Sequence, residues 1–165
     1  GNRSSAQFGP GGMSKRKEEP EEPPIEFTEW SVVSDELEAA EEDARAGSGG
    51  RYGRMRVTVF AHAWAPAAQA VARAAAGIAA EGDAEFADIA VVDASRAKEA
   101  CEEFGVVATP AVVLHWGGKA LTIKRPGWDD DVKYVGSISR ENLLDLLRVG
   151  RERASEGHTT VLYEL

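Results

Sequence analysis

The residues from 60 to 69 join an apolar run to an alanine-rich stretch, and they occupy a place where chemistry is common. In α/β proteins, functional side chains often follow the carboxyl end of a buried strand. Trp64 lies at this junction, followed by the run Ala65–Ala68, which reads Ala-Pro-Ala-Ala. None of these four side chains can transfer a proton, ligate a metal ion or attack an electrophile. The junction therefore predicts no catalytic group.

Cys101 is the only cysteine of the chain, and it lies in a helical pattern at residues 96–104. A single cysteine cannot form an internal disulfide. We interpret Cys101 as a small core residue, because free cysteine is among the most buried residue types. The alternative is a reactive thiol, which requires an exposed side chain with a lowered pKa.

The sequence contains no convincing metal or cofactor motif. Asp129-Asp130-Asp131 could bind a hard cation, but this run lacks the glycine and glutamate spacing of a calcium loop. No glycine-rich phosphate loop follows a strand. The histidines are too scattered for a zinc site: His62, His115 and His158. We predict no metal site and no cofactor.

The acidity of the chain is local. The 165 residues carry a net charge of −9, and residues 18–43 contain twelve acidic residues and no basic one. The rest of the domain is close to neutral and has no basic face, so nucleic acid is not an expected partner. No apolar run approaches the length of a membrane-spanning helix, so we expect no membrane span.

The hydrophobic pattern predicts strands and helices that alternate along the chain. Strands are predicted at 25–30, 54–60, 86–93, 119–124 and, in the segment 106–116, from Pro110 onward, because proline is tolerated at the start of a strand and not in its middle. Helices are predicted at 35–46, after a cap at Ser34, and at 67–80, 96–104 and 139–149. This order indicates an α/β fold with a mixed central β-sheet flanked by helices on both faces.

The elements define one domain, residues 25–150, between two tails. Residues 1–24 are rich in Gly, Pro, Ser and charge, and cannot bury enough apolar surface to offset the entropy of ordering. We expect this extended or disordered N-terminal tail to lie on a partner protein. Residues 151–165 are expected to be a C-terminal tail. The last seven residues have strand propensity and could add to a sheet edge, their own or a partner's.

Several segments resemble thioredoxins in the same order and spacing, from about Ile25 to Gly150. The matching segments are Val57–Phe60 with Ala63-Trp64, Val92-Asp93, Phe104–Ala111, Val113–Lys119 and Val135–Leu143. The resemblance implies a thioredoxin-like fold. It also implies a cis peptide bond before Pro110, since the family's Y-G-I-x-x-x-P-T segment contains a cis-proline.

The chain departs from this family at the redox site. The two cysteines of the family's W-C-G-P-C motif fall on Ala65 and Ala68, so the CxxC motif is missing. The family's buried acid falls on Val59, and the lysine that accompanies it falls on Ile89. Alanine cannot form the thiolate that attacks a disulfide. The resemblance therefore implies a redox-inactive member, with the former site converted to packing.

The walls of the family's peptide groove are retained at Trp64, Thr109, Pro110 and Gly136. The resemblance implies that main-chain atoms beside the cis-proline pair with an extended peptide. Such main-chain hydrogen bonding needs no cysteine. The loop at residues 125–133 looks longer than in plain thioredoxins and contains Trp128. Trp128 is a candidate anchor for a partner; the alternative is that it folds back on its own domain.

These features favour a non-enzymatic protein, an accessory subunit of a larger protein assembly that contacts other subunits through its tails and the 125–133 loop. Two alternatives remain open: a chaperone-like or substrate-recruiting domain of protein disulfide isomerase type, and a single-thiol redox enzyme that uses Cys101. The chain begins with Gly1 and not Met, which would suit an imported organellar protein of a plastid or mitochondrion.

Overall fold

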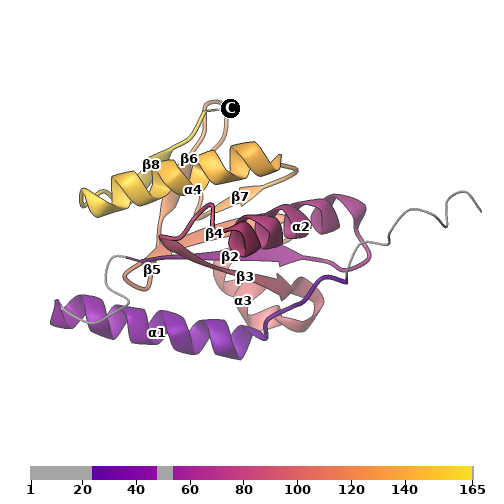
Figure 1. Cartoon of the computed structure of the whole chain (residues 1–165), viewed down its shortest axis with the longest axis horizontal. Helices are drawn as coiled ribbons and strands as arrows, with labels where there is room; N and C mark the ends of the chain where they lie inside the picture. The colour runs from indigo at the N-terminus through magenta and orange to yellow at the C-terminus, as the bar shows by residue number, and fades with distance from the viewer. Residues whose placement is uncertain (1–23, 48–53, 165) are drawn as a thin grey trace, which may run out of the picture.

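The computed structural model describes residues 24–47 and 54–164, drawn in Figure 1. The helices are α1 (Trp30–Ala46), α2 (Pro66–Glu81), α3 (Lys98–Phe104) and α4 (Arg140–Ser155), with a short 3-10 helix, η3 (Ala94–Arg96), before α3. The strands are β2 (Met55–Ala61), β3 (Ala87–Asp93), β4 (Ala111–Trp116), β5 (Lys119–Ala120), β6 (Thr122–Lys124), β7 (Lys133–Val135) and β8 (Thr160–Leu162). No helix among the described residues is long and apolar enough to cross a membrane.

The central sheet is mixed, as the sequence predicts. Its strand order is β3-β2-β4-β5, and β7 pairs with β4. β2 and β3 run parallel, whereas β4 is antiparallel to β2, β5 and β7. A second, two-stranded sheet pairs β6 with β8 in parallel. The strand β2 has partners on both sides, so all seven of its residues except Arg56 are buried.

Helices cover both faces of this sheet, which confirms the predicted layers. Alternate residues of a strand point to opposite faces. Val57 and Val59 of β2 belong to the core shared with α2 and α4. Phe60 belongs to the core on the other face, shared with α1 and α3. Figure 1 shows α1 and α3 below the sheet and α4 above it.

The predicted strand at residues 25–30 is wrong. Residues 24–29 are extended but form no ladder, and one bond ties them to β3, from the Thr28 amide to the Val91 carbonyl at 2.7 Å. The helix starts at Trp30, before the expected cap at Ser34. The Trp30 ring lies 5.9 Å from the rings of both Phe60 and Phe104, so aromatic packing fixes the first turn of α1.

The predicted end of the last helix at Gly150 is also wrong. A Cβ at Gly150 would lie 3.0 Å from Leu114 Cδ1, so this glycine allows α4 to pass close to the sheet and does not end the helix. The helix continues through Ser155. After it, β8 pairs with β6, and Tyr163 is buried with its hydroxyl donating to the Asn142 carbonyl at 2.8 Å.

The described part of residues 151–165 therefore packs on the domain and is not an extended tail. The alternative that the last residues join a sheet edge of their own chain is confirmed for β8. The predicted N-terminal tail falls outside the described residues, apart from Pro24.

Candidate functional site

The connection between β2 and α2 lies within residues 60–69, where the sequence predicts a strand followed by a helix. β2 ends at Ala61 and α2 begins at Pro66, which fits the first helical position because its missing N–H would have no partner there. Ala65 is the N-cap residue and has no side chain to cap the helix. The Gln69 side-chain amide donates instead to the Ala63 carbonyl and closes the turn.

The floor of this junction is apolar. Ala68 and Val59 are fully buried and belong to one core cluster, and Ala65 and Ile89 are partly buried against it. Val59 pairs across the sheet with Val91 and Val112. The four positions singled out from the family pattern therefore share one core. Their side chains contain no group that could accept or relay a proton.

The rim of the junction is held by polar contacts. His62 Nδ1 and Thr109 Oγ1 are hydrogen-bonded at 2.8 Å, and the His62 ring lies 5.0 Å from the Trp64 ring at an interplanar angle of 30°. The Thr109–Pro110 peptide bond is cis, as the resemblance implies. The Gly136 amide donates to the Pro110 carbonyl at 3.0 Å. These contacts bring together all four expected groove residues.

Two large apolar side chains in the connections that follow β2 and precede β4 face solvent. Trp64 is 75% exposed, and Val107, in the segment before β4, is 94% exposed. We call Trp64, Val107, Thr109, Pro110 and Gly136 the Trp64 surface. β4 begins directly after Pro110, the residue predicted to open this strand. The exposure of Val107, which lies before that strand, was not predicted, because an apolar residue type alone does not indicate an exposed side chain.

Cys101 lies on α3, which packs on the opposite face of the sheet from α2. Its thiol is partly buried and donates to the Ala94 carbonyl at 3.7 Å. Burial raises the pKa of the Cys101 thiol above its ordinary value. A raised pKa lowers the thiolate fraction, which is the nucleophilic form.

Trp128 combines features of both interpretations left open by the sequence. The Arg125 guanidinium lies 4.1 Å above the centre of the Trp128 ring and 4.0 Å above that of buried Tyr134. One face of the indole is thus tied to the domain, yet Trp128 is 59% exposed. Asp131 is bonded to Lys133 at 2.8 Å. Among the described residues, no group of three His, Cys, Asp or Glu side chains could hold a metal ion.

No protein-family model and no curated protein sequence matches this chain. Solved structures do resemble it. A thioredoxin from Fasciola hepatica is 17% identical with a TM-score of 0.50, over 74% of this chain and 94% of that one. Mitochondrial thioredoxin 3 from Saccharomyces cerevisiae is 12% identical with a TM-score of 0.50, over 74% of this chain and 91% of that one.

A third match is a structure described by the thiol-resolving mechanism of the yeast mitochondrial 1-Cys peroxiredoxin via glutathione and thioredoxin systems. It is 13% identical with a TM-score of 0.52, over 76% of this chain and 96% of that one. At such low identity, these likenesses establish the fold alone. The chain has a thioredoxin-like fold, as the sequence predicts.

Proposed function

We propose that this protein is a redox-inactive, non-catalytic thioredoxin-like subunit that binds another protein of a larger assembly through the Trp64 surface. The observation that carries this proposal is the exposure of Trp64 and Val107 beside a junction without a reactive group. Contiguous exposed apolar patches mark interaction sites in soluble proteins, and Trp64 and Val107 would each contribute to such a patch. Tryptophan is also one of the residue types enriched among the side chains that dominate binding energy.

The geometry favours an extended ligand. Residues 107–109 lie outside the β4 ladder, and the structure gives no backbone hydrogen bond to them among the described residues. An incoming strand could pair with their N–H and C=O groups, while its side chains contact Trp64 and Val107. The His62–Thr109 hydrogen bond and the Gly136–Pro110 hydrogen bond would hold this surface in one shape, which lowers the entropy cost of binding.

The interior of the junction supports a non-catalytic role. A dithiol mechanism requires two cysteines, and this chain has one, on the other side of the sheet. The raised pKa of Cys101 disfavours the single-thiol alternative. We expect no turnover in an insulin disulfide-reduction assay. Measurable turnover would contradict the proposal.

Recovery of the tagged full chain from its native cells tests the binding role. We expect one partner at fixed stoichiometry, lost in Trp64→Ala and in Val107→Ser. The matched control is Val32→Ser, which removes an exposed valine from α1 and should leave the partner bound. A heterogeneous set of unfolded clients would support the chaperone-like alternative. Equal recovery with Trp64→Ala and the unchanged chain would refute a role for this surface.

A further inference from the structure

The loop between β6 and β7 presents an aromatic ring and two carboxylates at its tip. We call residues 125–130 the Trp128 loop. Its base is closed by the Ile123–Asp131 bridge, in which the Asp131 amide donates to the Ile123 carbonyl at 3.2 Å. Within the loop, the Trp128 amide donates to the Arg125 carbonyl at 3.1 Å. The tip is therefore a closed turn on the sheet.

Arg125 fixes the orientation of the Trp128 ring. Its guanidinium is stacked between Trp128 and Tyr134, at 4.1 Å and 4.0 Å from the two ring centres. Tyr134 is buried and lies edge-on to Tyr163, so the stack rests on the core. The indole is held by one face, and its exposed area belongs to the remaining face and edge. An anchor held in this way loses little side-chain entropy on binding.

Two carboxylates follow Trp128 in the chain, on the solvent side of the loop, whereas the Arg125 guanidinium covers the inner face of the ring. Asp129 and Asp130 are exposed, and in the part of the chain that the structure describes neither forms a hydrogen bond or an ion pair. Asp131 differs, since it is bonded to Lys133 and to the Val132 amide. A cation over the indole would gain from the ring quadrupole and from these two carboxylates together.

We propose that the Trp128 loop binds an arginine-containing basic segment of a protein partner. An arginine guanidinium stacks on the open face of Trp128 and donates hydrogen bonds to Asp129 or Asp130. Arginine fits better than lysine, because its planar group stacks on aromatic rings while its N–H groups still reach a carboxylate. This inference rests on the proposed function only in assuming a protein partner, and it concerns a different surface.

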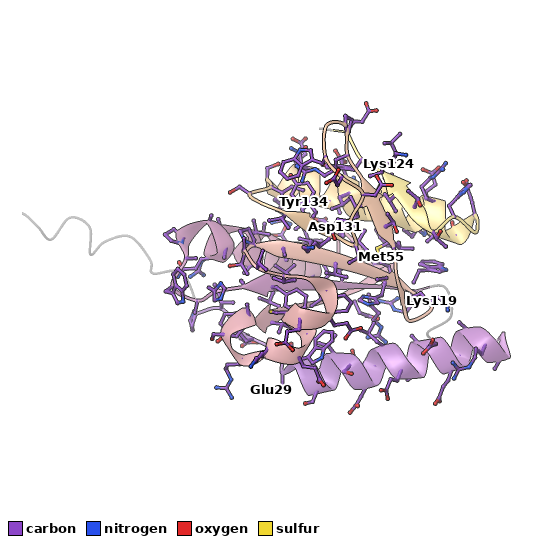
Figure 2. All side chains as sticks on the ribbon, turned by 180° about the vertical axis from the view of Figure 1, so that it is seen from behind. Glu29, Met55, Lys119, Lys124, Asp131 and Tyr134 are labelled. Carbon is purple, nitrogen blue, oxygen red and sulfur yellow. The ribbon has the colours of Figure 1, made fainter. Side chains whose placement is uncertain are left out.

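The second acidic surface of the protein serves as a control. Glu38 and Glu42 are exposed on α1. Figure 2 shows Lys124, Tyr134 and Asp131 in the upper half of the view and Glu29, the residue before α1, at the bottom. A basic peptide attracted only by net charge would contact α1 as readily as the Trp128 loop.

Titration of the full chain with a tetra-arginine peptide, followed by NMR, tests the proposal. We expect the Trp128 indole N–H signal to shift together with the amides of Asp129 and Asp130. Trp128→Ala and the double variant Asp129→Asn/Asp130→Asn should each weaken binding about five-fold, the factor expected for one exposed stacking or charge contact. The matched double variant Glu38→Gln/Glu42→Gln should bind like the unchanged chain. Tetra-lysine should bind more weakly than tetra-arginine.

Three results would overturn the proposal. The first is an equal loss of affinity in the α1 variant and the loop variants, which indicates diffuse charge attraction. The second is equal affinity for the arginine and lysine peptides. The third is a shift of the Trp128 signal on changing Lys15, Arg16 and Lys17 to Gln without peptide, which would make the chain's own basic run the occupant. None of these results depends on the Trp64 surface, so they are distinct from a failure of the proposed function.

Discussion

Burial of His115 makes the stability of the fold depend on pH. The side chain is 3% exposed, and its ring lies 5.4 Å from the Phe104 ring in an edge arrangement. Arg56 lies directly opposite His115 in the β2–β4 register. Burial lowers the pKa of His115 from 6.5 to about 4, because the imidazolium would lose its hydration.

The sign follows from this direction. As pH falls below 6.5, the unfolded chain binds a proton at His115 while the folded chain does not. The stability is therefore full above pH 6.5 and is lost as pH falls toward 4. Between about pH 7 and about pH 5, the free energy of unfolding should drop by about 2 kcal/mol from this group alone. That is a substantial part of the total of about 5–15 kcal/mol for a domain.

Urea unfolding at about pH 7 and about pH 5 measures this drop. Both pH values lie above the ordinary pKa of carboxyl groups, so most carboxylates stay ionised and contribute little to the difference. His115→Leu removes the buried imidazole, so its difference between the two pH values should be smaller by about 2 kcal/mol. His158→Gln removes an exposed histidine and should retain the drop caused by His115. An equal pH difference in the unchanged chain and in His115→Leu would refute the reasoning.

Further predictions concern packing and reactivity. Gly118→Ala should lower the free energy of unfolding by about 3 kcal/mol, because a Cβ there would lie 2.7 Å from the Leu37 carbonyl oxygen of α1. Gly127→Ala is its control in urea unfolding, with the same φ of +81° and open space, and should cost about 1 kcal/mol. Val59→Asp should lower the free energy of unfolding by about 3 kcal/mol or more near pH 7, because a carboxylate would replace a fully buried apolar side chain. A smaller loss would show that this position can accommodate a buried carboxylate. Cys101 should react with a thiol reagent more slowly in the folded chain than in urea, since burial raises its pKa; equal rates would restore the single-thiol alternative.

The fold could be predicted where local pattern and tertiary packing agree. The apolar runs of β2 and β3 and the glycines that end α2 and α3 coincide with the observed elements. The prediction failed where packing overrides a local signal. Ser34 is a good cap, but Trp30 begins the helix earlier because its ring packs on Phe60 and Phe104. Gly150 is a common stop, but here its missing Cβ serves close packing.

The residues of the candidate site could be predicted from the sequence, but the contacts between them could not. The family pattern pointed to Trp64, Thr109, Pro110 and Gly136. In the structure, the His62–Thr109 and Gly136–Pro110 hydrogen bonds and the His62–Trp64 ring contact connect these four residues. The bond between His62 and Thr109 joins residues 47 positions apart, which no local pattern reveals. The start of β4 after Pro110 follows from the proline, but the exposure of Val107 depends on how residues 106–109 lie against the domain, which the sequence does not show.

The buried and the exposed residues of the junction contribute differently to the stability of the fold. Ala68 and Val59 are buried, and apolar side chains there stabilise the core whether or not the protein has a partner. Trp64 and Val107 receive no such benefit, because most of their surface remains in water. Trp64 belongs to the family pattern, so Val107 is the exposed side chain that the pattern does not account for. Their exposure next to an apolar floor is the reason for proposing protein binding at the Trp64 surface, and replacing them while leaving the floor intact tests that proposal without disturbing the core.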